Sequence, residues 1–378
     1  MGPLNGFRII ELKGIGPGPY AGMLLADMGA DVIVVERSTR PGGLAMPSAQ
    51  DVHSRGKRSI ALDLKQPEGV ETLLRLIDSA DGLIEGFRPG VTERLGVGPE
   101  ACLARRPQLV YGRITGWGQT GPLSQAPGHD INYIGLTGSL AAIGSESKPA
   151  VPLNLIGDYA GGSLFLVSGM LAAMLAAQKT GKGQVVDAAI TDGSAHLMSG
   201  FYGWQDIGFW KAKRARNLLD GAAHHYNVYE TADQQFVAVG PLEPQFYTAF
   251  IELLGLDAEA FGPGQSITKW PELVATVADV FAQETLATWQ QRLEGTDACV
   301  SPVLDINAAT RHPHNVERGT YIDVGGVVQP APAPRFSDTP SDTPAAPHAE
   351  GIDGDAVLAD AGFGDDEIAE LRERGVLG

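Results

Sequence analysis

The sequence predicts an α/β protein in which a mostly parallel sheet forms a large domain and a smaller α+β domain is attached to it. At 378 residues, the chain is too long for one comfortable core and fits two domains of unequal size. Strand and helix signals alternate over its first third, an order typical of parallel sheets covered by helices on both faces. With 43% hydrophobic and 19% charged residues, the composition is that of an ordinary globular protein.

The first elements form a β-α-β unit. Apolar runs at residues 7–12 and 31–36 predict two strands, the second buried on both faces, and residues 21–28 between them predict a helix. Residues 67–80 then carry Val, Leu and Ile at helical spacing, and the apolar run at 82–85 predicts the next strand. This repeated order implies parallel strands joined by crossover helices.

The elements that follow extend the sheet and then leave it. Residues 109–114 predict a strand, residues 161–178 a long apolar core helix, and residues 184–187 another strand. Residues 229–305 mix a hairpin-like pair of strands with amphipathic helices, whereas residues 328–348, rich in Pro, Ala, Ser and Asp, are typical of an extended connector. The expected division is a large domain at 1–180, a linker at 181–227, a small domain at 228–318, a second linker at 319–350 and a C-terminal segment at 351–378 that returns to the large domain.

The charge of the chain is acidic and unevenly distributed. A net charge of −17 argues against nucleic acid as a partner. Residues 1–110 contain 13 Lys and Arg against 13 Asp and Glu, so the whole acidic excess lies after that point. The N-terminal third is therefore the part of the chain best suited to bind an anion.

Composition also bears on the location of the protein. No apolar run approaches the roughly 20 residues that a membrane helix needs, and the N-terminus lacks the basic start and apolar middle of a signal peptide. The only cysteines, Cys102 and Cys299, lie far apart in the chain, as is typical of buried thiols in a reducing compartment. We therefore expect a cytoplasmic protein with no membrane contact.

A glycine-rich loop follows the first predicted strand. Residues 14–19, Gly-Ile-Gly-Pro-Gly-Pro, open a helix and precede Glu36 by about 20 residues, much like a dinucleotide fingerprint. Pro19, however, stands where the fingerprint has its third glycine, and with Pro17 it stiffens a loop that should wrap a pyrophosphate. We interpret the loop as a rigid turn that starts the helix, or as backbone lining the pocket of another nucleotide.

Nine motifs in order along the chain carry a resemblance to one known family. They lie at residues 14–19, 25–31, 63–65, 85–90, 115–121, 128–133, 181–187, 243–247 and 297–304. On these motifs the chain resembles the family III CoA-transferase superfamily and, within it, the branch of the α-methylacyl-CoA racemases. The resemblance covers nearly the whole chain.

This resemblance implies both a fold and an activity. The implied fold is a Rossmann-like large domain that binds CoA and a small domain joined to it by two linkers, in an intertwined homodimer. The implied reaction is racemisation of the α-carbon of 2-methyl-branched acyl-CoA thioesters by proton transfer through an enolate. It implies no metal and no cofactor, because CoA is part of the substrate.

A CoA site needs cations, because CoA carries several phosphate groups that guanidinium and ammonium groups bind with charge-assisted hydrogen bonds. Arg37 and Arg40 follow the second strand, where an open α/β sheet places nucleotide contacts. With the contacts that the resemblance implies, the predicted CoA-binding residues are Arg37, Arg40, Leu62, Asp63, Leu64, Lys65, Gly86 and Arg88.

The implied chemistry needs two proton-transfer groups on opposite faces of one carbon, each titrating near the operating pH. His129 follows Pro127 and Gly128 at the start of a predicted helix, and Asp158 opens another helix between glycines. The residues alone favour a capping or packing role for His129 and an N-cap role for Asp158. The resemblance implies instead that His129 and Asp158 are the acid–base pair.

Two further residues complete the predicted catalytic set. Asp130 lies at the helix start beside His129, where free backbone N–H groups favour negative charge. The resemblance implies that the Asp130 backbone N–H binds the thioester oxygen. It also implies that Glu243, a first-turn acid by its position in the sequence, hydrogen-bonds His129 from the small domain of one or the other subunit.

Two other functions are open at this point. In family III CoA transferases, the residue aligned with Asp158 attacks the thioester and forms a mixed anhydride. His129 beside Asp130 favours racemisation, because the transferases generally lack that histidine. A non-catalytic CoA-binding protein would have lost at least one of His129, Asp158 and Glu243, and all three are present.

The sequence departs from its relatives at several positions. His224 stands where many relatives have Pro, and its neighbour His225 makes a poor metal clamp because adjacent side chains diverge, so we interpret the pair as non-metal. The methionine surface expected for the acyl chain is thin around Met198. The preferred acyl chain therefore stays open.

Overall fold

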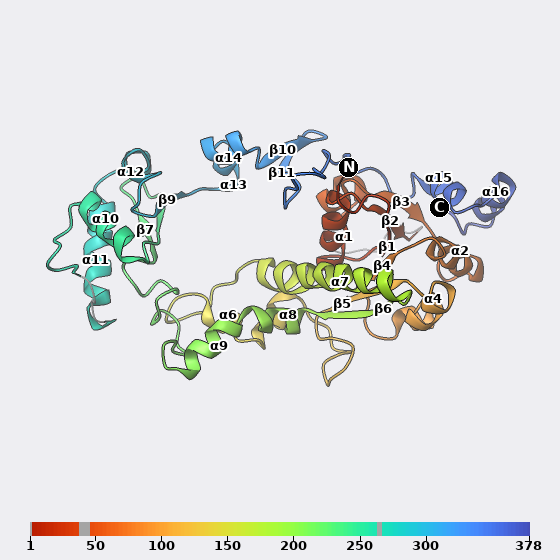
Figure 1. Ribbon diagram of the computed structural model, residues 1–378, viewed down its shortest axis with the longest axis horizontal. Helices are drawn as coiled ribbons and strands as arrows, with labels where there is room; N and C mark the ends of the chain where they lie inside the picture. Colours follow the sequence, from red (N-terminus) through yellow and green to blue (C-terminus); the bar gives the residue numbers. More distant parts are fainter. Residues whose placement is uncertain (1, 38–45, 263–266) are drawn as a thin grey trace. The chain divides into compact units, whose positions relative to one another are not determined.

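The computed structural model describes residues 2–37, 46–262 and 267–378, so the predicted CoA contact Arg40 lies outside the described residues. The chain divides into two compact units (Figure 1). The large unit comprises Met1–Thr137, Leu153–Met198 and Gly319–Gly378. The small unit comprises Gly138–Pro152 and Ser199–Arg318.

The large unit is built on a six-stranded sheet with strand order β3-β2-β1-β4-β5-β6, and every pairing in it is parallel. Its strands are β1 Arg8–Leu12, β2 Asp31–Glu36, β3 Arg58–Ala61, β4 Gly82–Glu85, β5 Val110–Thr115 and β6 Gln184–Ala189. The predicted parallel sheet is confirmed. Because β1 pairs with β2 on one side and β4 on the other, the carboxyl ends of β1 and β4 flank a topological switch point, where open α/β sheets bind ligands.

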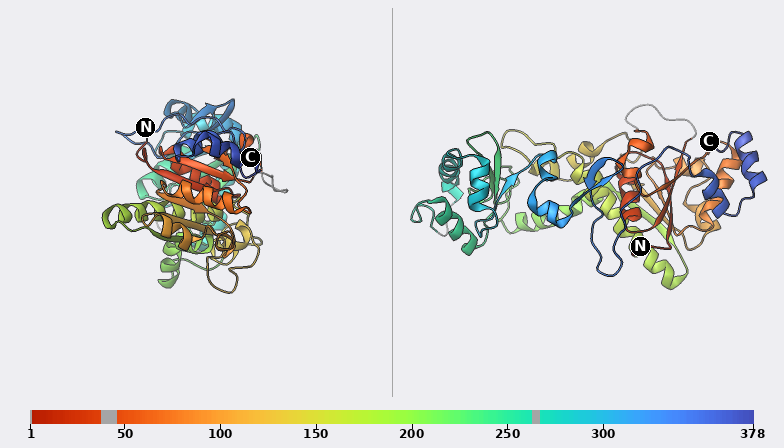
Figure 2. Two further views of the ribbon diagram at one scale, coloured as in Figure 1. Left: turned by 90° about the vertical axis from the view of Figure 1, so that its right-hand side faces the viewer. Right: turned by 90° about the horizontal axis from the view of Figure 1, so that it is seen from above.

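Helices cover both faces of this sheet. The first face, with Ile10 and Ile33, packs against α2 Pro67–Ile77, α4 Pro99–Arg105, α15 Gly354–Asp360 and α16 Asp365–Glu373. The second face, with Ile9 and Val32, packs against α1 Pro17–Asp27 and α7 Phe165–Thr180. Figure 2 shows α15 and α16, in blue, beside the N-terminal strands and α2. Adjacent residues of β1 thus serve opposite cores, as the twofold period of a strand requires.

The boundary of the large unit differs from the expected one. The expected strand near 184–187 is β6, which pairs with β5 from Gln184 to Ala189. Helix α8, Ile190–Leu197, follows directly and belongs to the same unit. The first part of the range 181–227, expected as a linker, is therefore part of the sheet domain, because β6 completes its edge.

A long apolar helical stretch covers the second face of the sheet. It begins as a π-helix, η3 Leu155–Leu164, and continues as α7. Leu155–Thr180 is long and apolar enough to cross a membrane, with a mean hydropathy of 1.8 and half of its most apolar window buried. The expectation that no apolar run approaches this length is therefore wrong. Leu166 and Met170 pack against the sheet, and such a core helix needs apolar residues along most of its length.

The small unit holds a three-stranded antiparallel sheet covered by helices. The strands are β7 Asn227–Glu230, β8 Phe236–Val239 and β9 Val300–Val303, in that order. Its core contains Phe250, Phe281 and Trp289 from α10 Pro244–Leu254, α11 Trp270–Phe281 and α12 Leu286–Leu293. The hairpin-like pair that the sequence indicates is β7 and β8.

The chain returns to the large unit after residue 318. A hairpin of β10 Tyr321–Val324 and β11 Val327–Pro330 precedes the extended segment. The buried Arg55 donates to two oxygens of this hairpin, Gln329 Oε1 at 2.7 Å and the Pro330 carbonyl at 2.8 Å. The remaining helices are η1 Ser48–Gln50, η2 Val52–Ser54, α3 Val91–Arg94, α5 Asp130–Gly135, α6 Ser139–Ala142, α9 Ser199–Asp206, η4 Ile267–Lys269, α13 Ile306–Ala309 and α14 Pro313–Arg318.

Candidate active site

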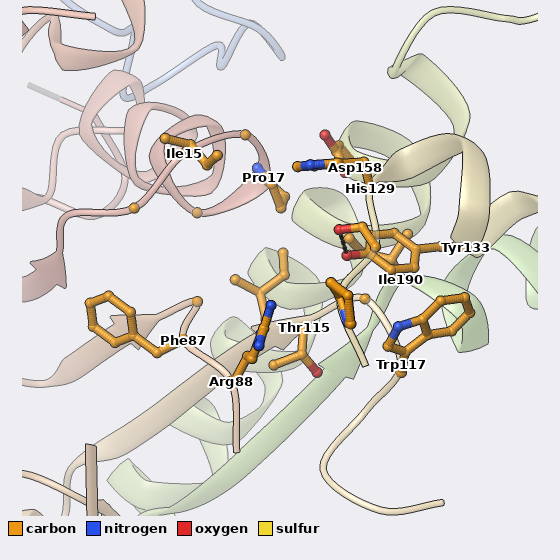
Figure 3. A pocket seen from close by; sticks show the side chains of 18 of the residues that line it. Ile15, Pro17, Phe87, Arg88, Thr115, Trp117, His129, Tyr133, Asp158 and Ile190 are labelled. Carbon is orange, nitrogen blue, oxygen red and sulfur yellow. Dashed lines mark hydrogen bonds between the residues drawn. The ribbon is translucent and has the colours of Figure 1, made fainter. Parts of the chain in front are cut away.

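A cavity of about 550 Å³ lies in the large unit at the carboxyl ends of β1, β4 and β5 (Figure 3). The loops that follow these strands form three of its walls, and the start of α5 and the first turn of η3 supply further walls. His129 and Asp158 both line this cavity. The fold therefore brings together the two residues that the sequence singled out as an acid–base pair, from segments almost 30 residues apart.

The backbone around Asp158 is fixed by a second carboxylate. The Asp158 N–H donates to Asp130 Oδ1 at 2.7 Å, and the Asn154 side-chain amide donates to Asp158 Oδ2 at 3.4 Å. A Cβ atom at Gly157 would lie 2.2 Å from Asp130 Oδ1, so only glycine allows this approach. Asp130 thus holds the turn of η3 that presents Asp158 to the cavity.

The Asp158 carboxyl titrates far above an ordinary aspartate. Burial raises its pKa to about 6; the neighbouring Asp130 acts in the same direction, while the Asn154 hydrogen bond and the nearby His129 oppose the rise. Burial also raises the pKa of Asp130, whose Oδ2 has no hydrogen-bond partner among the described residues. A carboxyl with a pKa near 6 can both accept and donate a proton around neutral pH.

His129 lies at the N-cap of α5 with its backbone fixed and its imidazole exposed to the cavity. Its backbone N–H donates to Asn132 Oδ1 at 3.0 Å. The next N–H, that of Asp130, is the first of the helix and so has no acceptor within it. Figure 3 shows His129 and Asp158 at the same end of the cavity as Pro17.

Aromatic packing positions the loop before His129. The Tyr133 hydroxyl donates to the Gly128 carbonyl, and the Tyr133 ring meets Trp117 edge-on with 4.8 Å between centroids. Cβ atoms at Gly116 and Gly128 would lie 2.0 and 2.7 Å from the Tyr133 ring. The glycines in these two motifs therefore serve close packing, which keeps His129 at the edge of the cavity.

The glycine-rich loop after β1 faces Asp158 directly. Gly16 has a φ of +72°, and a Cβ atom there would lie 3.1 Å from Asp158 Oδ2. Glycine is thus required for two reasons, the left-handed backbone conformation and the close approach to the carboxylate. Both interpretations of the loop find support, since it starts α1 and also lines the cavity.

A second cavity, of about 430 Å³, lies beside the ends of β1, β2 and β4. Two of its cations are Lys13 and the exposed Arg37. The buried Glu36 carboxylate also lines it, and accepts hydrogen bonds from the Ser48 and Ser59 hydroxyls at 2.8–2.9 Å. Six residues line both cavities, which therefore adjoin: Gly14, Ile15, Gly16, His53, Gly86 and Phe87.

The structure separates the predicted CoA contacts into two groups. Arg37, Gly86 and Arg88 line one or both cavities. Residues 62–65 are absent from both linings. Leu62 is a core residue that bridges to the C-terminal Leu377, Leu64 packs against that core, and Asp63 accepts the Lys65 N–H at 3.0 Å. Any contact of this turn with a ligand would therefore come from its backbone or from the exposed Lys65.

The loop that carries Gly86 and Arg88 is anchored by a buried ion pair. Glu85 at the end of β4 receives Arg113 Nε at 2.8 Å and the Phe87 N–H at 2.7 Å. Burial raises the pKa of Glu85, while the hydrogen bond from the Phe87 N–H and the charge of Arg113 act to lower it. Arg113 also binds Glu93 at 2.9 Å, so one guanidinium joins β5, the end of β4 and α3.

Two predicted features lie in the small unit. Glu243 is the exposed N-cap residue of α10. His224 is fully buried, and its Nε2 is 2.7 Å from the Tyr247 hydroxyl; burial, with the neighbouring His225, lowers the pKa of His224 to about 4. Burial also lowers the pKa of His225, so both imidazoles are neutral near pH 7, and they meet edge-on with 4.7 Å between centroids. Among the described residues, no group of three or more His, Cys, Asp or Glu could hold a metal ion.

Sequence reasoning missed two aromatic side chains of the cavity wall. His53 lies in a short 3-10 helix, and Tyr159 follows Asp158 directly. Both rings contact Tyr20 of α1, with centroid distances of 5.7 and 4.4 Å. The adjacency of Tyr159 to Asp158 was a usable signal, whereas nothing in the sequence around His53 indicates a pocket.

Comparison with known proteins identifies the family to which the chain belongs. Residues 4–352 match the family model described as CoA-transferase family III. The chain is 44% identical to the mouse alpha-methylacyl-CoA racemase, covering 97% of this chain and 96% of the mouse protein. It is 43% identical to the human alpha-methylacyl-CoA racemase, covering 99% and 97%. A CaiB/BaiF family protein from Brucella suis has the same fold, with a TM-score of 0.80, 26% identity and coverage of 95% and 99%.

Proposed function

Because the chain belongs to CoA-transferase family III, we propose that it is an α-methylacyl-CoA racemase that inverts the α-carbon of 2-methyl-branched acyl-CoA thioesters. One observation of the structure supports the proposal in addition to the sequence similarity. His129 and Asp158, two groups of different chemical type, line one cavity at the switch point of the sheet, and the pKa of Asp158 is raised to about 6. Perturbed titratable groups in such a cleft are typical of catalysis.

The reaction that we propose has two proton transfers. A thioester acidifies its α-hydrogen, because the charge left on the carbon spreads to the carbonyl oxygen. One of the pair, His129 or Asp158, removes the α-proton from one face and leaves an enolate, and the other delivers its own proton to the opposite face. In the reverse direction the roles exchange, so each group must work as acid and base. The thioester bond stays intact throughout.

The enolate oxygen needs a donor that is fixed before the reaction. We propose that the free N–H of Asp130 at the start of α5 fills this role, since a preorganised donor stabilises charge that develops in the transition state. We also propose that Glu243 hydrogen-bonds His129 and sets its tautomer. We infer the contact between Glu243 and His129 from the resemblance to the racemases.

We propose that the second cavity binds the phosphate-bearing part of the substrate's CoA. We propose that Arg37 and Lys13 bind its phosphates, because both line a cavity at the end of β2, where open α/β sheets bind nucleotides. Arg88 and the exposed Lys65 supply further positive charge along this edge. No cofactor is required in this scheme, because the thioester itself acidifies the carbon.

We propose that the active form is an intertwined homodimer. The chain passes between its two units at residues 137–138, 152–153, 198–199 and 318–319, and crossings of this kind allow two chains to interlock. Exposed apolar side chains on and after α9, including Tyr202, Ile207 and Phe209, offer surface that a second chain could bury.

The proposed activity is tested with either enantiomer of 2-methyldecanoyl-CoA in heavy water. We expect deuterium to enter the α-carbon while each enantiomer drifts to a near-equal mixture, with no free CoA or free acid, as followed by mass spectrometry and chiral chromatography. A CoA transferase would instead form an acyl-anhydride at Asp158, which hydroxylamine traps. Acyl exchange onto added carboxylic acids without α-deuteration would contradict racemisation and support transfer.

A further inference from the structure

The place where the two cavities adjoin is lined by six residues, and only one of them has a polar side chain. Gly14, Gly16 and Gly86 present backbone, and Ile15 and Phe87 are apolar. The sixth is His53. A ligand that fills both cavities at once must pass this imidazole.

Neighbouring rings and a carboxylate fix the orientation of His53. Its ring meets Tyr20 edge-on at 5.7 Å and Tyr159 edge-on at 5.8 Å. Its Nδ1 lies 3.5 Å from Asp51 Oδ1, and the Asp51 carboxylate also receives Lys13 Nζ at 3.4 Å. None of the residues that the structure describes forms a hydrogen bond with His53 Nε2, and the His53 side chain is 28% exposed. Nε2 is thus the ring atom left available to a ligand.

The charge state of this imidazole follows from its surroundings. Burial lowers the pKa of His53, and the cations Lys57, Lys13 and Arg55 lower it further, while Asp51 opposes them. The ring is therefore neutral near pH 7. A neutral imidazole carries one proton, and a carboxylate beside Nδ1 favours the tautomer with that proton on Nδ1. Nε2 is then an acceptor and suits an N–H donor.

We propose that His53 is a substrate-binding residue whose Nε2 accepts a hydrogen bond from a secondary amide N–H in the arm of the acyl-CoA thioester, where the arm passes between the two cavities. The proposal rests on the proposed function, since it needs a ligand with phosphates in one cavity and a thioester in the other. The bond stabilises the bound arm, so its loss weakens the binding of CoA and of the thioester alike. His53 itself exchanges no proton with the substrate.

Two substitutions separate this role from simple packing. His53→Phe keeps a ring against Tyr20 and Tyr159 but removes the acceptor, whereas His53→Gln restores an acceptor without the ring. We expect His53→Phe to weaken the binding of both CoA and the thioester substrate by about 3- to 10-fold, the usual range for one hydrogen bond, with kcat changed less than twofold. His53→Gln should recover most of the affinity. Calorimetry gives the Kd for CoA, and the deuterium assay with racemic substrate gives kcat and KM.

Four outcomes decide between the explanations. Unchanged CoA affinity and KM in His53→Phe would overturn the inference, as would a loss of kcat at unchanged KM, which assigns His53 to the chemistry. Equal impairment of the Gln and Phe variants would overturn it too, because packing alone then explains the effect. If the parent protein itself does not bind CoA, the proposed function fails and this inference fails with it.

Discussion

Asp158 differs from three buried carboxylates of the large unit in the groups that surround its charge. Glu11, Asp27 and Glu85 are each paired with a buried cation, from Lys57, Arg55 and Arg113 at 2.5, 2.6 and 2.8 Å. Asp158 has an amide and a second carboxyl as neighbours, and no ion pair with a described Lys or Arg. A buried cation thus compensates each of these three carboxylates, whereas Asp158 lacks such a partner and its pKa is raised toward neutrality.

The raised pKa of Asp158 predicts a pH dependence of the rate. Below about pH 6 the carboxyl is protonated and cannot remove the α-proton. For the enantiomer whose proton Asp158 removes, kcat/KM should therefore fall about tenfold per pH unit on the acidic side. The pH profile of kcat/KM, measured separately for each enantiomer, checks this. A profile that stays flat from pH 7 to pH 4.5 for both enantiomers would contradict the assignment.

The same shift predicts that Asp158 costs stability. Its folded pKa lies above its unfolded one, so the folded state binds the proton more tightly, and stability falls as pH rises from below 4 to above 6. Asp158→Asn removes this loss. We expect the variant to gain roughly 2 °C or more in Tm at pH 7.5 and to match the parent at pH 3.5. A gain of equal size at both pH values would show a cause other than ionisation.

At the scale of elements, the loop between β1 and α1 joins the two cavities and rests on a buried ion pair. Lys57 Nζ binds Glu11 Oε2 at 2.5 Å and the Pro19 carbonyl at 2.9 Å, with the Lys57 and Glu11 side chains 1% and 0% exposed. A Cβ atom at Gly22 would lie 2.0 Å from Glu11 Oε2, so α1 packs directly on this pair. The pair therefore ties the start of α1 to β1.

Lys57→Met should consequently destabilise the protein by about 3–5 kcal/mol, because Glu11 is left buried without its cation. Urea unfolding gives the free energy. The double variant Lys57→Met/Glu11→Leu removes both charges and should recover most of the loss. If the single variant is as stable as the parent, Glu11 does not depend on Lys57 for neutralisation.

The elements also show what sequence reasoning can and cannot reach. Apolar runs such as those of β2 and β5 identify strands because both faces of a parallel sheet are buried, and the motifs around His129 and Asp158 identify the candidate pair. The π-helix η3 has no comparable signal, because the hydrogen bond that holds its first turn joins the Asp158 N–H to Asp130, 28 residues earlier in the chain. His53 and the membership of β6 in the sheet depend on long-range contacts that local periodicity does not encode.

For the whole molecule, the proposed interlocked dimer predicts unusual exchange behaviour. If two chains wind around each other through their crossings between units, they cannot separate without unfolding. Dimers of isotopically light and heavy chains, mixed and incubated at 25 °C, should then form no mixed dimers until they are denatured and refolded. Native mass spectrometry gives the populations. Dilution that yields a folded, active monomer would contradict the interlocked arrangement.

The central claim is that His129 and Asp158 act on opposite faces of one carbon, and single variants test it most directly. In heavy water, His129→Ala should exchange the α-proton of the one enantiomer that faces Asp158, with little inversion, and Asp158→Ala should exchange only the other enantiomer. Both variants should still bind CoA. Deuterium content and enantiomeric ratio, read together by mass spectrometry and chiral chromatography, give the answer. Loss of exchange for the same enantiomer in both variants would contradict the two-face mechanism.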